Sequence, residues 1–237
     1  GWSSAATWTA AVAATLLLFA SVLAHEFGHS LVARSQGIPV IGITLFLLGG
    51  VARLGREPDS PGREAWMAIA GPLVSVAIAA GSIGLAFALP GPEQLVAVLA
   101  YLGVANAALV AFNLLPGFPL DGGRVLRAFL WWRSRDLLRA TRRAALVGQV
   151  FAWGFIALGA GQLVLGGGLG GIWLALVGWL MVQAARATTR QAEMDRALAG
   201  VSAGRIMTTP AAWLSPFVTL AHAAQGSLKD YESRCLP

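Results

Sequence analysis

Long apolar stretches separated by short polar connections dominate this sequence of 237 residues. A helix needs about 20 predominantly apolar residues to cross the hydrocarbon core of a bilayer, which is roughly 30 Å thick. Five stretches come close to or exceed that length, so each is predicted to be a transmembrane helix. They cover residues 8–32, 65–89, 95–113, 144–165 and 171–187. The pattern therefore predicts an all-α polytopic membrane protein with five transmembrane helices in this chain.

One more apolar segment, IPVIGITLFLLGGVARL, lies between the first two predicted helices and is too short to cross a bilayer. It begins with β-branched residues and contains Gly49 and Gly50, which favours two strands joined by a turn. We expect a re-entrant, membrane-associated β-hairpin. Such backbone is tolerated at membrane depth only where protein or a water-filled cavity satisfies its polar groups, so the hairpin is expected to border a cavity.

Composition and charge agree with a membrane protein. Hydrophobic residues make up 57% of the chain and charged residues only 12%. The net charge of +6 could indicate a nucleic-acid partner. However, all 17 basic residues lie in three segments: between the first and second predicted helices, between the third and fourth, and after the fifth. Because cytoplasmic connections retain Lys and Arg, we expect these segments and the C-terminal tail to be cytoplasmic, with no nucleic-acid partner. Within them, FLWWRSRDLLRATRR is either a helix at the lipid headgroups or a plain basic loop.

The stretch FASVLAHEFGHSLVA places His25, Glu26 and His29 inside the first predicted helix. Ionisable groups at membrane depth are costly and usually functional. Residues four apart lie on one helical face, so both imidazoles can bind one metal ion while Glu26 serves as a general base, as in metalloproteases. Nine residues separate His25 from Arg34, about 13 Å of helix, which predicts a site within the membrane near its cytoplasmic side. The structural alternative is a pair of core histidines bonded to carbonyls beside a buried, protonated glutamate.

A third metal ligand is expected from the stretch NLLPGFPLDGGR. Pro116 and Pro119 end the third predicted helix, and Gly122 and Gly123 permit unusual dihedral angles that could fold Asp121 back into the bundle. One Zn²⁺ with Asp121, one glutamate and two neutral histidines is a neutral cluster, which reduces the cost of burying charge. Asp121 could also be the N-cap of the following helix, which is compatible with metal binding.

HEFGH in a transmembrane helix, followed two helices later by NLLPGFPLDGG, resembles the site-2 proteases, which are intramembrane zinc metalloproteases. LGGVAR and GPLVS also resemble stretches of that family, and the resemblance covers roughly residues 8–187. It implies a core of about six transmembrane helices and one zinc ion per chain, in a prokaryotic plasma membrane. The site residues that it implies are the zinc ligands His25, His29 and Asp121, the catalytic base Glu26, and Asn113 close to the active site.

The substrate implied by this resemblance is a single-span membrane protein such as an anti-sigma factor or a membrane-bound transcription regulator. A helical peptide bond is shielded by its own hydrogen bonds, so the substrate must unwind before it is cleaved. The extended backbone could then pair with the edge of the hairpin, near Gly49, Gly50 and Val51. Asn113 is expected either to donate to the developing oxyanion or to orient the interrupted backbone. Gly71 and Ser75 are interpreted as small residues for close helix packing.

The predicted domains are a protease core at residues 1–190 and a cytoplasmic tail at residues 191–237. VSAGRIMTTPAAWLSPFVTLAHAAQGSL resembles the start of a CBS domain, a nucleotide-sensing module found in one subgroup of site-2 proteases, but the tail is too short to complete one.

Two other function classes remain open: a divalent-metal transporter that uses the same three ligands as a transit site, and a proteolytically inactive membrane scaffold. The lipid bilayer and a second copy of the chain, in a homodimer, are further expected partners.

Overall fold

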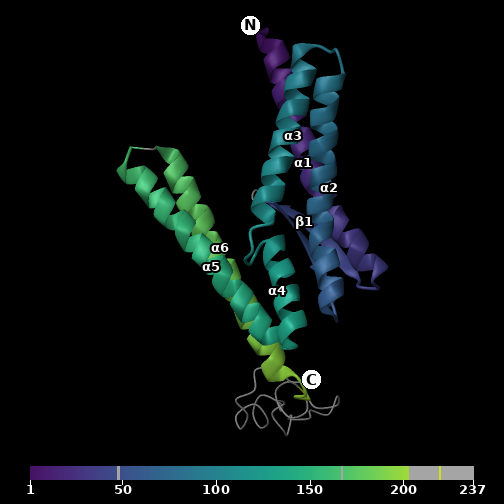
Figure 1. Ribbon diagram of the computed structural model, residues 1–237, viewed down its shortest axis with the longest axis vertical. Coiled ribbons are helices and arrows are strands. Elements are labelled where there is room, and N and C mark those ends of the chain that lie inside the picture. The colour runs from purple at the N-terminus through teal and green to yellow at the C-terminus, as the bar shows by residue number, and fades with distance from the viewer. Residues whose placement is uncertain (47–48, 167, 203–218, 220–237) are drawn as a thin grey trace. The chain divides into compact units, whose positions relative to one another are not determined.

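The computed structural model describes residues 1–46, 49–166, 168–202 and 219. The chain divides into two units, Gly1–Met194 and Asp195–Pro237. The CBS-like segment of the second unit lies almost wholly outside the described residues. In chain order the elements are α1 (Ser4–Ser35), β1 (Val40–Phe46), β2 (Gly49–Leu54), α2 (Pro61–Ala88), α3 (Glu93–Asn113), α4 (Asp121–Ser134), α5 (Leu137–Val164) and α6 (Leu169–Leu198), and they are shown in Figure 1.

Within the described residues, five helices are long and apolar enough to cross a membrane: α1, α2, α3, α5 and α6. They coincide with the five predicted stretches, so this part of the prediction is confirmed. The observed helices run further than the apolar stretches, since α5 begins at Leu137 and α6 ends at Leu198. The extensions are rich in Arg, Ala and Leu, which favour helix in water as well as in lipid.

Local signals fix several helix ends. The Ser3 hydroxyl accepts a hydrogen bond from the Ala6 backbone N–H at 3.3 Å and caps α1. α2 begins with Pro61, whose fixed φ and missing N–H suit the first helical position. The Asp136 carboxylate accepts from the Arg139 backbone N–H at 3.0 Å and caps α5. The stretch FLWWRSRDLLRATRR therefore belongs to two helices, the end of α4 and the start of α5, rather than to a plain loop.

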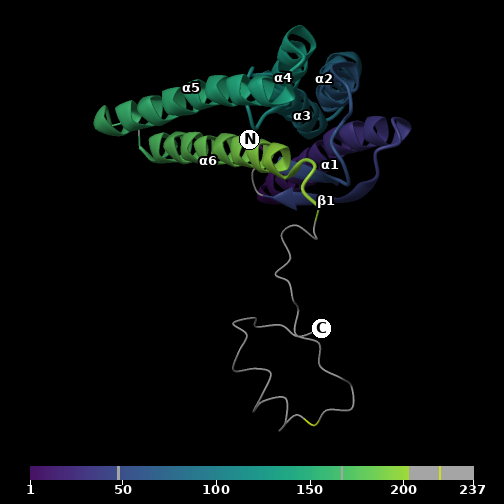
Figure 2. The same cartoon turned by 90° about the horizontal axis from the view of Figure 1, so that it is seen from below.

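Helices α1, α2 and α3 pack against one another, and α4 packs against both α2 and α5. The Asn106 amide of α3 donates to the Ser21 hydroxyl of α1 at 3.1 Å, which ties these two helices one turn from His25. Helices α5 and α6 lie side by side in both views (Figures 1 and 2). Small residues permit this approach, since a Cβ on Gly159 would lie only 2.7 Å from the Ala175 backbone N.

Large apolar side chains cover the outside of the spanning helices. They include Leu16, Phe27, Leu31, Val150, Trp153, Ile172 and Trp179, each of which is about half exposed or more. An apolar exterior of this extent is unfavourable in water and is the surface expected of helices in lipid. Together with the five spanning helices, it identifies a multi-pass integral membrane protein.

Strands β1 and β2 form a two-stranded antiparallel sheet within the described residues, from the pair Val40 and Leu54 to the pair Phe46 and Gly49. The sheet lies against α1. The predicted hairpin is thus observed as a small sheet, whereas its re-entry into the membrane stays a prediction. Among the elements, α1, α2 and the α3–α4 connection position the candidate site.

Candidate metal centre

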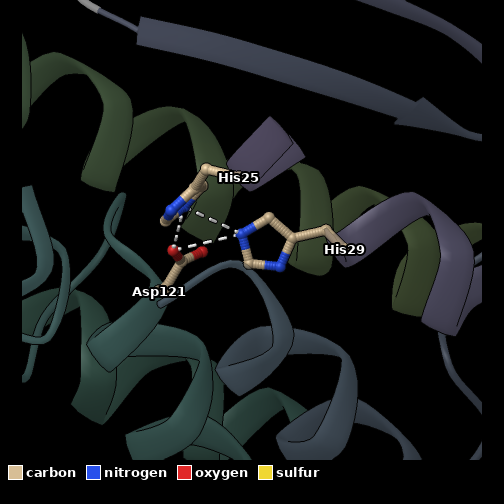
Figure 3. Close-up of side chains that lie close together, drawn as sticks. All are labelled: His25, His29 and Asp121. Atoms are coloured by element: carbon tan, nitrogen blue, oxygen red, sulfur yellow. Dashed lines mark hydrogen bonds and ion pairs between the residues drawn. The ribbon is translucent and has the colours of Figure 1, made fainter. Parts of the chain in front are cut away.

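Three side chains from distant parts of the chain converge on one point (Figure 3). His25 and His29 come from α1, and Asp121 is the first residue of α4. Each histidine Nε2 lies 3.2 Å from Asp121 Oδ2, and the two Nε2 atoms lie 3.2 Å from each other. Three donor atoms thus form a nearly equilateral triangle, in agreement with the geometric prediction made from the sequence.

The size of this triangle suits a zinc ion. Tetrahedral zinc with bonds of 2.0–2.1 Å separates its ligand atoms by about 3.3 Å. The histidines are 3% and 6% exposed, and 13% of the Asp121 side chain is exposed. Burial alone would raise the pKa of the Asp121 carboxyl, but hydrogen bonds with His25 and His29 outweigh burial and hold its pKa at about 2. Asp121 is therefore an anion at neutral pH, as a metal ligand must be.

The second nitrogen of each imidazole is held by α2. His29 Nδ1 lies 2.7 Å from the Met67 carbonyl oxygen, which can only accept, so Nδ1 carries the proton and Nε2 presents its lone pair. His25 Nδ1 lies 2.9 Å from the hydroxyl of Ser75, a residue that is fully buried. Partners of this kind fix the tautomer and ring orientation of histidines that bind metals.

Gly71 completes this contact between α2 and the imidazoles. A Cβ on Gly71 would overlap the Nε2 atom of His29 and would lie 2.7 Å from Nε2 of His25. Only a residue without a side chain allows α2 to approach the two rings this closely. Met67, Gly71 and Ser75 lie on one face of α2, together with Glu64, and we call these four residues the α2 stripe.

The histidines face inward because of their helical spacing. On the same helix, Phe27 and Leu31 are 49% and 64% exposed, whereas Glu26 and Gly28 are buried with the histidines. Glu26 directly follows His25 and is buried on the same side of α1. α1 therefore presents an apolar surface outward and a polar HE..H face to the interior.

The connection between α3 and α4 brings Asp121 to the histidines. α3 ends at Asn113, and the two prolines of NLLPGFPLDGGR lie in the connection, as the sequence predicts. A Cβ on Gly122 or Gly123 would overlap backbone atoms of residues 114–118, so glycine is required for this tight return. Leu120 is the N-cap of α4, and Asp121 is the first helical residue, so Asp121 is free to point into the site rather than to cap its helix.

The remaining predicted site residues lie on neighbouring elements. Asn113 is the last residue of α3 and is partly exposed, eight positions before Asp121. Gly49, Gly50 and Val51 belong to β2, where their backbones pair with Phe46, Leu45 and Thr44 of β1. Side chains at these β2 positions lie outside what the structure describes, so their role in substrate binding stays a prediction.

Sequence reasoning missed the supporting residues. Ser75 does more than allow close packing, because its hydroxyl is bonded to His25, and the Met67 carbonyl carries no sequence signal at all. Glu64 and Arg127 were expected in cytoplasmic connections, yet both are buried and paired with each other. The available signal was the spacing of Glu64, Gly71 and Ser75, which places three polar or small residues on one face of an apolar helix.

Comparisons with known proteins identify relatives of this chain. A profile of peptidase family M50 matches residues 13–92 and 91–156. Rip3 of Mycobacterium tuberculosis is 42% identical over 211 residues, which cover 88% of this chain and 54% of Rip3. Zinc metalloprotease MJ0392 of Methanocaldococcus jannaschii is 33% identical over 219 residues, which cover 90% of this chain and 60% of that protein. The solved structure of a site-2 protease from Methanocaldococcus jannaschii matches with a TM-score of 0.58 and 34% identity, and the match covers 73% of this chain and 76% of that one.

The chain belongs to peptidase family M50. The donor set of two imidazoles and one carboxylate, with the zinc metalloprotease among the relatives, fits a zinc cofactor. The chain spans a little more than half the length of the curated relatives that it matches. Membership of the CBS-bearing subgroup stays a prediction.

Proposed function

We propose that this chain is the core of an intramembrane zinc metalloprotease, which hydrolyses a peptide bond in or near the transmembrane segment of a single-span membrane protein. The observation that carries the proposal is the convergence of His25, His29 and Asp121, with 3.2 Å between each pair of donor atoms. The apolar exterior of α1 beside these residues supports a site at membrane depth.

The residues take separate roles in this proposal. His25, His29 and Asp121 hold the zinc ion, which supplies a Lewis acid that polarises the scissile carbonyl and makes a water molecule more acidic. Glu26 accepts the proton of the attacking water and later delivers it to the leaving amine. Its position next to His25, on the buried face of α1, supports this role.

The substrate is proposed to bind as an extended segment. A peptide bond in a helix is shielded by its own hydrogen bonds, so the substrate must unwind locally before hydrolysis. The edge of the β1–β2 sheet, near Gly49, Gly50 and Val51, offers backbone groups for strand pairing, and this sheet lies against the helix that carries the histidines. Asn113 is proposed to donate to the oxyanion or to orient the backbone beside it.

The chemistry of the substrate follows from the location of the site. A single-span protein such as an anti-sigma factor or a membrane-bound transcription regulator would release a soluble part when it is cut there. We propose that the enzyme lies in a prokaryotic plasma membrane with its C-terminal tail in the cytoplasm, since the basic residues gather on one side.

The test compares wild-type protein with Glu26→Gln in reconstituted membranes. The substrate is a single-span test protein whose membrane segment contains Gly and Pro, paired with a version in which these residues are Leu. Wild type should bind one zinc ion per chain and cut the Gly/Pro version faster. Glu26→Gln should retain zinc and lose at least about a hundredfold in cleavage rate, because general acid–base catalysis typically contributes that much or more.

The matched control is Glu93→Gln, which changes a glutamate in the first turn of α3 and should retain both zinc and cleavage. Undiminished cleavage by Glu26→Gln, or by zinc-free wild type, would reject the metalloprotease proposal. Zinc flux across proteoliposomes that is equal in wild type and Glu26→Gln would favour a transporter. Stable binding of the test protein by wild type without any turnover would favour a scaffold.

A further inference from the structure

A buried ion pair joins the first turn of α2 to the middle of α4. Arg127 of α4 donates to Glu64 Oε1 of α2 through both Nε and Nη2, each at 2.5 Å. Glu64 is 0% exposed and Arg127 is 4% exposed. Both nitrogens reach the same carboxylate oxygen, and the planar guanidinium group makes this charge-assisted contact directional, so it restricts the rotation of one helix relative to the other.

The two partners belong to the two elements that organise the metal centre. Glu64 is one turn before Met67 in the α2 stripe, and the other three members of the stripe contact the imidazoles. Arg127 is six residues after Asp121 on α4, about 9 Å along the helix axis. The ion pair therefore connects the helix that orients the histidines with the helix that carries the third donor.

Arg127 also contacts the connection that leads into α4. Its guanidinium group lies over the ring of Phe118, 5.2 Å from the ring centroid, three residues before Asp121. A third contact, from Nη1 to the Glu57 carboxylate at 3.5 Å, reaches the segment before α2. In the sequence, Asp121 thus lies between Arg127 and Phe118, the residue whose ring the Arg127 guanidinium group contacts.

Stability alone is a poor explanation for this arrangement. Taking two charges out of water is costly, and replacing a buried ion pair by apolar residues is often neutral or stabilising. An apolar pair would not fix the rotation of α4 relative to α2, since it packs equally well over a range of helix rotations. Asp121, at the first position of α4, would move with any such rotation.

We propose that Glu64 and Arg127 are positioning residues for the metal centre: their ion pair holds Asp121 Oδ2 at the correct distance from the two imidazoles. This inference rests on the proposed zinc site. It predicts that the pair contributes to zinc affinity separately from its effect on folding.

The experiment uses the double variant Glu64→Leu/Arg127→Met of the full chain in detergent. Zinc affinity is measured by competition with a chelator, and thermal unfolding is measured on the zinc-free protein. The zinc-free double variant should unfold at or above the wild-type temperature, while its zinc affinity falls at least about tenfold, as is typical when outer partners of metal ligands are changed. The matched control, Glu193→Leu/Arg142→Met, removes an exposed ion pair between α5 and α6 and should leave zinc affinity unchanged.

A second variant, Arg127→Lys, keeps the charge but not the two-pronged contact, and its zinc affinity should also fall. Wild-type zinc affinity in both variants would overturn the inference. A zinc-free double variant that no longer folds would overturn it too, since the pair would then serve stability. Wild-type protein that binds no zinc would instead reject the proposed function itself, which separates the two failures.

Discussion

α1 and α2 contribute to the metal centre in different ways, beside α4, which supplies Asp121. α1 carries two donor side chains in the short motif HEFGH, whereas among the described residues α2 contributes none to the cluster. Yet the α2 stripe contacts both imidazoles, through the Met67 carbonyl, the Gly71 backbone and the Ser75 hydroxyl. The choice of donor atoms and their orientation are therefore encoded in different segments of the chain.

The largest expected effect comes from removing a donor. Asp121→Ala deletes the carboxylate that lies 3.2 Å from both Nε2 atoms. Only two of the three donor atoms, the two imidazole nitrogens, then remain. Zinc affinity should fall by more than about a hundredfold, which exceeds the effect of changing a supporting residue. Metal analysis after dialysis against a weak chelator measures it. Asp59→Ala, on an exposed carboxylate paired with Arg63, is the matched control and should keep its zinc.

A smaller but still large effect is expected on α2, where no donor is lost. Gly71→Ala places a methyl group where the Nε2 atoms of His25 and His29 now lie, so α1 and α2 must move apart. We expect zinc affinity to fall by about ten- to a hundredfold, as measured by chelator competition. Gly81→Ala on the same helix has open space around its Cβ and should bind zinc like wild type. Equal affinities in the two variants would mean that the close approach of α2 does not matter.

The smallest of the three effects is expected from a single hydroxyl. Ser75→Ala removes the partner of His25 Nδ1 without adding bulk, so the imidazole keeps its place but loses its fixed orientation. A decrease of about tenfold in zinc affinity is expected, at the low end for outer partners. Ser82→Ala, a buried serine two turns further along α2, is the comparison variant. If both serine variants behave alike, Ser75 serves packing only.

The three donor residues were predictable because each is marked by a short stretch of sequence. HEFGH places both histidines on one helical face whatever the rest of the fold does, and Asp121 lies where two prolines end the third predicted helix and two glycines permit a tight return. The five spanning helices were predictable for a similar reason, since a long apolar run has few alternatives in a membrane protein.

The orientation of the donors could not be predicted, because it depends on the packing of helices that are distant in sequence. A serine or glycine in an apolar helix looks the same whether it packs against a neighbour or bonds to a ligand, as Ser75 and Gly71 show. The presence of a charged residue in a basic segment also does not reveal whether its side chain is buried. Arg127 belongs to the same basic segment as Arg133, yet only Arg127 is buried, because α4 turns that face toward α2.

The most direct measurement is anomalous X-ray scattering at the zinc edge from crystals of the zinc-loaded protein. We expect one strong peak per chain, about 2.0–2.2 Å from Nε2 of His25, Nε2 of His29 and a carboxylate oxygen of Asp121. A peak at any other position, or a fully zinc-loaded protein in which Asp121 lies away from the two imidazoles, would contradict it.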